Sequence, residues 1–401
     1  METTAPAALS QAPAAPRLSL VLSGGGARAA YQVGVLRYLG LRLPHTHVPV
    51  ITGVSAGAIN TFCLASHTGN LREATGTLTD RWLSLSTSDV FRTATTAMAT
   101  TAVRWVGALA SGGARLAPSV RGLVDTEPLR RFLNNVVDPS CIEENLRNGR
   151  LRAVGISATS YHTGQTVTWV QAEDTVEMWE RTRRRSLRAK ITVDHVMASS
   201  AIPLLFPAVQ IGDDYFGDGS IRQSNPLAPA VHLGAEKILA ISSRYGRTGV
   251  EARDPVMHGY PPPAHIIGLL LNSIFLDSLD ADSARLTRIN HLISRIPEAT
   301  REKLALRQVG LLVIRPSRDL GMLASGHEAR LPRALRFLVR GLGTRGSRSS
   351  DFLSYLLFER SYIGELLRLG ERDAERQWPR IAEFLGVDET VGAGAPGLMR
   401  D

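Results

Sequence analysis

Cysteine is scarce in this chain: Cys63 and Cys141 are the only two among 401 residues. Two cysteines cannot build a disulfide framework, and neither lies in a Cys/His cluster with the spacing of metal ligands. We therefore expect a protein of a reducing compartment, cytoplasmic by default, without a structural zinc site. No cofactor is predicted.

Long hydrophobic runs are also missing. A helix that spans a bilayer needs about eighteen or more consecutive apolar residues, and the best candidate, Ile266–Leu279, contains Asn272, Ser273, Asp277 and Ser278. We therefore expect a chain that does not cross a membrane but can lie on its surface.

Acidic residues are absent from Thr3 to Arg72, and the whole chain carries a formal net charge of +9. A strongly basic protein favours an anionic partner such as an acidic bilayer surface or nucleic acid. The scattered arginines are equally compatible with an Arg-rich proteome. The densest basic run, Arg181–Lys190, is predicted to be a solvated helix face, with contact to an anionic lipid surface as the alternative hypothesis.

Two strand-loop-helix units open the chain. Arg17–Leu22 is a short apolar run that ends in a glycine loop, and residues with helical periodicity follow. The pattern repeats with Val48–Thr52, the turn Gly53–Gly57 and the helical Ala58–Ser66. Such repetition predicts an α/β fold with a mainly parallel central sheet and helices on both faces.

Three segments are predicted along the chain. Residues 1–16, rich in Ala and Pro and without the features of a secretory signal, are expected to be a disordered leader. Residues 17–245 form the predicted catalytic core, and residues 246–401 a mostly helical C-terminal part packed on it. Further strands are predicted at Leu151–Ala158, Thr166–Val170, Lys237–Ser242 and Gly310–Ile314, and helices around 265–280, 332–341 and 352–369.

The segment Gly53–Gly57 matches the pattern G-x-S-x-G. Its glycines allow a sharp turn from strand to helix that raises the hydroxyl of Ser55 clear of the backbone, and the helix N-terminus behind it favours negative charge. Ser55 is therefore the candidate nucleophile for acyl transfer.

The glycine loop Gly24–Gly26, followed by Arg28, presents backbone N–H groups suited to an oxyanion hole or a phosphate cradle. A dinucleotide site needs an acidic residue about twenty positions later, and a P-loop needs Lys followed by Ser or Thr. The sequence contains neither. Close packing of helix on strand remains the structural alternative, and Ser111–Arg115 is a similar motif without a clear strand before it.

An activated serine needs a base, and the acid-free stretch requires that base to come from a distant loop. Asp218 lies between two glycines at a predicted turn, whereas Asp213 and Asp214 nearby fit solvated turn positions. Histidine is the usual activator of serine, but no partner pattern marks His195, His45 or His47, whose expected roles are structural.

Taken together, the motifs at Leu22–Leu36, Gly53–Asn60 and Asp218–Ser220 resemble the patatin-like phospholipase family, as do Ala198–Pro207 and Asn225–Leu227. This resemblance implies a lipid ester substrate, an acyl-enzyme, a Ser–Asp dyad without histidine, and no metal. Its dyad maps to Ser55 and Asp218, and its oxyanion loop to Gly24, Gly25 and Gly26 with Arg28 beside them.

Two residues depart from the family pattern. Ala29 replaces the last glycine of the glycine-rich motif, and Ser220 stands where Gly or Ala is commoner. Both are small, so an altered rate is expected rather than an inactive protein. Thioesterase or acyltransferase activity, a silent lipid-binding module at the membrane surface and nucleotide binding by the glycine loop are the alternatives. Nucleic acid is not expected as a partner, and the oligomeric state is left open.

Overall fold

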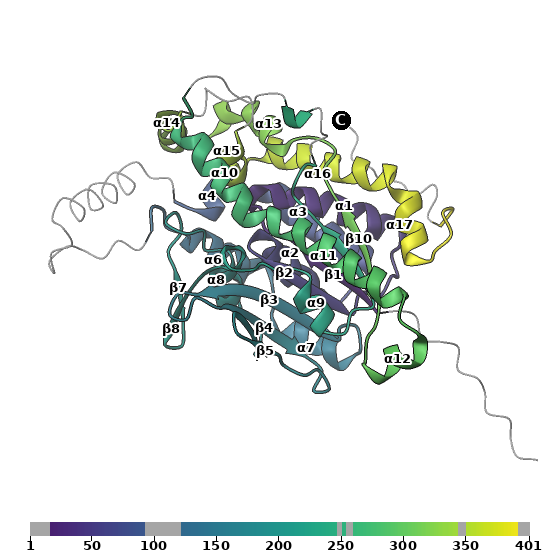
Figure 1. Ribbon diagram of the computed structural model, residues 1–401. Helices are drawn as coiled ribbons and strands as arrows, with labels where there is room; N and C mark the ends of the chain where they lie inside the picture. Colours follow the sequence, from purple (N-terminus) through teal and green to yellow (C-terminus); the bar gives the residue numbers. More distant parts are fainter. Residues whose placement is uncertain (1–16, 93–121, 247–250, 254–259, 344–349, 392–401) are drawn as a thin grey trace, which may run out of the picture.

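The computed structural model describes residues 17–92, 122–246, 251–253, 260–343 and 350–391. The predicted leader at 1–16 and the second glycine motif at Ser111–Arg115 lie outside the described residues. Figure 1 shows a central sheet covered by helices, with the last helices of the chain lying across the first ones.

A ten-stranded sheet forms the centre of the molecule, with the order β10-β9-β1-β2-β3-β4-β6-β5, while β8 pairs with β3 and β7 with β8. Its strands are β1 (Leu18–Leu22), β2 (Val50–Val54), β3 (Ala153–Ser160), β4 (Thr166–Ala172), β5 (Glu180–Arg181), β6 (Arg184–Arg188), β7 (Val209–Ile211), β8 (Asp214–Asp218), β9 (Lys237–Ile241) and β10 (Gly310–Ile314).

The half of the sheet from β10 to β3 is parallel throughout. Beyond it, β4 and β8 both run antiparallel to β3, and β6 is parallel to β4. The predicted α/β fold with a mainly parallel sheet is confirmed, with antiparallel strands added on one side. In the parallel half, Leu22 is in register with Gly53, so the glycine loop and the serine turn leave the sheet at the same edge.

Helices surround this sheet. The longer ones are α1 (Ala30–Arg42), α2 (Ala56–Ala65), α3 (Leu71–Ser84), α6 (Glu127–Val136), α10 (Pro263–Phe275), α11 (Asp277–Ser294), α14 (Arg333–Gly341) and α16 (Arg360–Arg376). The shorter ones are α4 (Thr87–Val90), α7 (Ser140–Arg147), α8 (Val193–Ser199), α9 (Ala228–His232), α12 (Glu298–Lys303), α13 (Leu320–Ser325), α15 (Asp351–Leu356), α17 (Trp378–Leu385) and the 3-10 turns η1 (Gly26–Ala29), η2 (Gly219–Ile221), η3 (Glu251–Arg253) and η4 (Glu328–Arg330).

Both faces of the sheet are covered by apolar side chains, because alternate residues of a strand point to opposite faces. Leu20 and Leu22 of β1 belong to the large core that includes α1, α2 and α16. Val21 points the other way, into a smaller core completed by Ala230 of α9 and Leu279 of α11. The helices on both faces that the sequence predicted are present.

The C-terminal residues share this core with the N-terminal ones. β10 adds the outermost parallel strand beside β9, and α16 crosses α1 closely: a Cβ on Gly34 would lie 2.0 Å from the carbonyl oxygen of Leu367, and one on Gly370 would lie 2.2 Å from that of Tyr31. Glycine therefore permits the two helices to touch. The boundary at residue 245 stays a prediction.

The basic run Arg181–Lys190 is a strand hairpin and not the predicted helix. β6 pairs with β4 along its whole length, from Arg184 opposite Thr166 to Arg188 opposite Val170, and β5 pairs with β6. Pairing with an existing sheet overrides the helical preference of arginine-rich sequence.

One helical stretch, 263–294, is long and apolar enough to span a membrane by length and composition, and 28% of its most apolar window is buried inside the protein. It consists of α10 and α11, which join at Leu276. Phe275, Leu276 and Leu279 are buried in the protein core at this junction.

Candidate active site

Ser55 sits on a strained turn between β2 and α2. Its backbone has φ 55° and ψ −132°, a conformation that residues other than glycine rarely adopt and that is often found at functional sites. The two glycines around it are sterically required: a Cβ would lie 2.3 Å from the Thr61 hydroxyl at Gly53 and 2.2 Å from the Leu22 carbonyl oxygen at Gly57.

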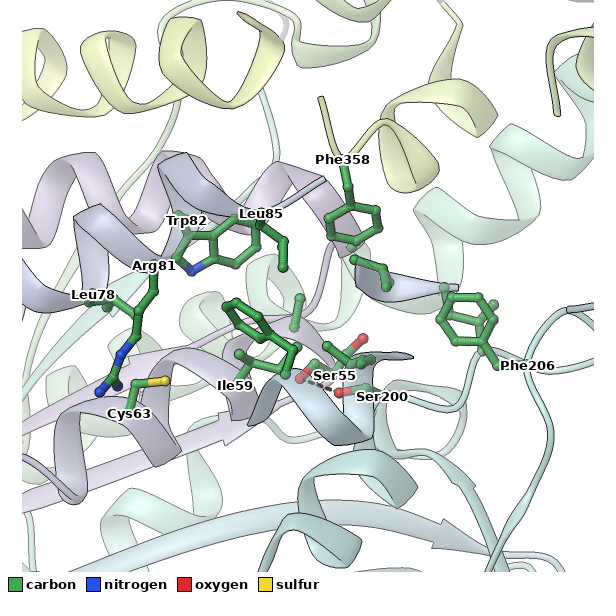
Figure 2. A pocket seen from close by; sticks show the side chains of 16 residues that line it. Ser55, Ile59, Cys63, Leu78, Arg81, Trp82, Leu85, Ser200, Phe206 and Phe358 are labelled. Atoms are coloured by element: carbon green, nitrogen blue, oxygen red, sulfur yellow. Dashed lines mark hydrogen bonds between the residues drawn. The ribbon is translucent and has the colours of Figure 1, made fainter. Parts of the chain in front are cut away.

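Two serines of the α8 segment hold this turn. The Ser55 N–H donates to Ser199 Oγ at 2.9 Å, and Ser199 Oγ donates to the Ser157 carbonyl oxygen at 2.6 Å. Ser200 Oγ donates to the Ser55 carbonyl oxygen at 3.0 Å, the bond drawn in Figure 2. These roles were not predicted from the sequence, although the segment Ala198–Pro207 had been recognised as part of the resemblance.

The glycine loop lies directly against Ser55. A Cβ on Gly24 would be 3.0 Å from Ser55 Cβ and 2.9 Å from Ser220 Oγ. Gly25 and Gly26 both have positive φ, 152° and 56°, and a Cβ on Gly26 would be 2.2 Å from a backbone oxygen. Only glycine can follow this path. The N–H groups of Gly24 and Gly25 have no hydrogen-bond acceptor among the described residues.

Asp218 reaches the same place from the end of β8, where it pairs with Ala158 of β3. Its carboxyl group is fully buried. Oδ1 accepts a hydrogen bond from the Ser220 N–H at 2.9 Å, while Oδ2 is buried and has no hydrogen-bond partner of normal geometry among the described residues. A buried carboxylate oxygen without a hydrogen-bond partner lowers the stability of the fold. Such a costly arrangement is typical of a functional group.

Burial raises the pKa of Asp218 to about 7. The main cause is the loss of water around the charged form, while interactions with the Ser55 side chain and with the N–H and hydroxyl of Ser220 act in the opposite direction. An ordinary aspartate, with a pKa near 3.9, is a weak base, and burial makes this carboxylate a stronger one.

The model of the family described as patatin-like phospholipase matches residues 20–231 of the chain. The chain belongs to the patatin-like phospholipase family. It is a lipid hydrolase of this general class. Among curated proteins, none matches the sequence.

The solved structures that resemble this chain include the following three. VipD from Legionella pneumophila is 13% identical, with a TM-score of 0.31, 88% of this chain covered and 67% of that one. Human GIVD cytosolic phospholipase A2 is 13% identical, with a TM-score of 0.42 and coverage of 92% and 59%. ExoU of Pseudomonas aeruginosa, in complex with SpcU, is 16% identical, with a TM-score of 0.22 and coverage of 96% and 82%.

Arg28 of the patatin-like glycine loop is buried, and its guanidinium is held by the C-terminal helices. Nε donates to Ser354 Oγ at 2.6 Å, and an NH2 group donates to Asp351 Oδ1 at 2.7 Å. The guanidinium also contacts Asn272 Oδ1 at 3.2 Å and stacks over the Tyr355 ring at 4.4 Å. These contacts fix the glycine loop against α15.

An apolar pocket opens beside Ser55 in the patatin-like fold (Figure 2). It extends along α2, with Ser200, Phe206 and Phe358 near Ser55 and with Cys63 and Leu78 at the other end. The remaining apolar lining is Ala56, Ile59, Trp82, Leu85, Val90, Leu129, Phe132 and Ile202. The free volume of this pocket is only about 30 Å³, so the pocket is nearly filled by its own lining side chains in this structure.

The three histidines considered as activators of the serine lie outside the pocket at Ser55. The His195 ring packs edge-on against Trp169 with 4.6 Å between ring centroids, and burial lowers its pKa to about 4. His45 and His47 line a different cavity. No histidine lines the pocket at Ser55, and no cluster of potential metal ligands occurs in the described parts of the chain.

Proposed function

We propose that the protein hydrolyses acyl esters of phospholipids or lysophospholipids through an acyl-enzyme, with Ser55 as nucleophile and Asp218 as its base. The observation that carries this proposal is the meeting of a strained serine turn, a buried carboxylate and a glycine loop at one edge of the sheet. Family membership gives the lipid hydrolase class; the dyad is our assignment.

In the proposed first step, the Ser55 hydroxyl attacks the ester carbonyl carbon while its proton moves to Asp218. The carbonyl oxygen becomes an oxyanion, and the N–H groups of Gly24 and Gly25, which lack internal acceptors, are assigned as its donors. The tetrahedral intermediate collapses as the alcohol leaves, taking the proton from Asp218 and leaving the acyl group on Ser55.

The second half of the reaction reverses these roles. A water molecule gives its proton to Asp218 and attacks the acyl carbonyl carbon, and the fatty acid leaves as Ser55 Oγ regains the proton. Asp218 is well suited to both half-reactions because its pKa of about 7 allows it to accept and return a proton near neutral pH. No histidine is needed for this cycle.

The proposal predicts an acid limb in the pH profile. Because Asp218 must be ionised to accept the proton, kcat/KM should rise roughly tenfold per pH unit at low pH and level off above about 7, the pKa set by burial. The measurement is kcat/KM of a soluble ester substrate from pH 4 to 9. A profile that stays flat from pH 4.5 to 8 would contradict the assigned base.

The apolar pocket is assigned to the acyl chain of the substrate. Cys63 lies eight residues beyond Ser55 along α2, which places it about 12 Å away at the rise of an α-helix. The side chains between them are almost entirely apolar, as a hydrocarbon chain requires. The closed pocket must widen when the chain enters.

Filling the far end of this pocket should shorten the preferred acyl chain. For Cys63→Phe we expect the kcat/KM ratio of a sixteen-carbon to a four-carbon ester to fall about tenfold or more, because buried methylenes lose their site. The matched control is Cys141→Phe, whose cysteine is half-exposed and outside the pocket. Equal ratios in both variants would remove the acyl assignment.

Helix α10 offers an apolar face toward solvent next to the candidate site. Leu269 and Leu270 are 53% and 58% exposed, while Phe275 at the end of the same helix lies against the glycine loop, 3.0 Å from a Cβ built on Gly24. We assign this face to contact with the membrane that supplies the substrate, because exposed leucines beside a lipid-hydrolysing site can enter a bilayer surface.

Polar substitutions on α10 test this contact. Leu269→Ser with Leu270→Ser should lower hydrolysis of phospholipid vesicles on the order of tenfold while hydrolysis of a soluble short-chain ester is unchanged. Leu292→Ser with Leu304→Ser, also at strongly exposed leucines, is the matched control. Parallel losses on both substrates would show a local structural role for α10 and not a bilayer contact.

A further inference from the structure

A second cavity, of about 290 Å³, lies beside the β5–β6 hairpin. Arg181, Arg183 and Arg184 line it from the hairpin, and Arg222 lines it from the segment that follows η2. This cavity shares no lining residue with the pocket at Ser55. It is far larger than the roughly 10–15 Å³ that one water needs.

These arginines lack acidic partners. No carboxylate within the described ranges lies within ion-pair distance of Arg181, Arg183, Arg184 or Arg222. Arg222 Nε donates to the Gly164 carbonyl oxygen at 3.0 Å, and a guanidinium N–H of Arg181 donates to the Glu180 carbonyl oxygen at 2.7 Å. The Nε of Arg184 is buried without a hydrogen-bond partner. The four guanidinium groups therefore present unused donors around one space.

Asp282, the acid that acts on Arg184, reduces this positive charge little. Asp282 favours the charged form of Arg184, but Arg181 and Arg285 oppose it, and burial is the largest cause of the lowered pKa of Arg184. Asp282 already accepts hydrogen bonds from Asn225 Nδ2 at 3.1 Å and from a backbone N–H. The local potential stays positive.

The pKa of His232 is affected by the same positive charges. Arg184 and Arg181 both contribute to the lowered pKa of His232, after the larger effect of burial. His232 stacks on Trp179, with 4.7 Å between ring centroids, and Trp179 forms part of the cavity wall. One aromatic side chain therefore borders the same cavity as the four arginines.

We propose that this cavity binds a phosphorylated ligand between the hairpin arginines and Arg222. Guanidinium groups recognise phosphate through paired N–H donors, and the neutral groups of Gln223, Ser224 and Asn225 complete the lining. A cavity of about 290 Å³ has room for one phosphorylated group rather than for the extended backbone of a nucleic acid. The ligand is either a lipid head group or a free phosphate compound.

The cavity is connected to the candidate active site through bonded groups. Arg222 comes four residues after Asp218, and Gln223 Nε2 donates to Ser157 Oγ at 3.1 Å. The Ser157 carbonyl oxygen accepts the bond from Ser199 that holds the Ser55 turn. A ligand in the cavity thus contacts the segment that carries the assigned base, but the binding proposal does not depend on the proposed catalytic dyad.

Binding is tested with two probes on the full-length protein. Inositol hexakisphosphate, followed by calorimetry, represents a free phosphate compound; phosphatidylcholine vesicles with and without a phosphoinositide, followed by co-sedimentation, represent a lipid head group. The variant is Arg183→Gln with Arg222→Gln, which takes one exposed residue from each wall. Arg131→Gln with Arg147→Gln, at exposed positions on α6 and α7, removes the same charge elsewhere.

We expect the wild type to bind at least one probe and the cavity variant to bind it at least tenfold more weakly, while the control pair binds normally. Binding of the free compound would identify a soluble ligand, and binding of phosphoinositide vesicles alone would identify a head group. Equal weakening in the control pair would show a general charge effect and overturn the proposal. Absence of binding to both probes, or tighter binding of a single-stranded RNA oligomer, would also overturn it.

Discussion

Replacing Ser55 by alanine is expected to abolish fatty-acid release from phospholipid vesicles, with kcat lowered by about four to six orders of magnitude. The size of this loss follows from the acyl-enzyme route, which has no alternative nucleophile once the hydroxyl is gone. Ser84→Ala, at an exposed serine at the end of α3, is the matched control and should retain full activity. Retention of a tenth of the activity in Ser55→Ala would contradict the assignment.

Asp218→Asn should produce a loss of similar size for a different reason. The amide has the same shape but cannot accept the serine proton. Its effect on stability separates catalysis from folding. Because burial raises the pKa of Asp218 from 3.8 to about 7, the wild type loses stability as the pH rises between these two values, and the full cost of the ionised carboxylate is present above about 7. At pH 8 the Asn variant should therefore melt no lower than the wild type, while its activity is lost.

Breaking the ion pair of Arg28 and Asp351 is the second large expected effect. Their side chains are 4% and 18% exposed and lie 2.7 Å apart, and the contact joins the glycine loop to α15. Removal of one partner from a buried pair leaves the other charge uncompensated. We expect Asp351→Ala to lower the free energy of unfolding by about 3 kcal/mol and to lower kcat, since the loop that Arg28 positions is released.

A double-mutant cycle gives this prediction its control. Arg28→Met combined with Asp351→Ala should lose less stability than the sum of the two single variants, because the second change no longer leaves a charge alone. The exposed pair Arg92 and Asp125, 3.2 Å apart, should give almost no change when either partner is removed. Additive losses in the buried pair would indicate independent packing effects and contradict the ion-pair account.

Local sequence pattern predicted the elements that carry the candidate site. β1 was predicted almost to the residue, because its apolar run is ended by the glycines of the loop. β2 was expected at Val48–Thr52 and runs Val50–Val54, since the strand continues through Gly53 into the serine turn. Glycine usually weakens a strand, but here its absent side chain makes the turn possible.

Contacts between residues far apart in the sequence could not be predicted from local sequence patterns. Nothing local marks Asp351 or Ser354 as partners of Arg28, from which they are separated by more than 300 positions. The basic hairpin was predicted as a helix because a solvated helix face is the commonest explanation of a dense charge run, whereas pairing with β4 determines its extended form. Asp218 was identified from its glycine neighbours, whereas its burial depends on the packing of β3 and β8.

The measurement that tests the central claim most directly is fatty-acid release from phospholipid vesicles by the purified wild-type protein, followed by mass spectrometry of the peptide that contains Ser55. The account predicts steady release of fatty acid and, after rapid acid quenching, an acyl group on Ser55 that disappears in Asp218→Asn. Release without an adduct on Ser55 but with one on another residue, or vesicle binding with no release, would contradict it.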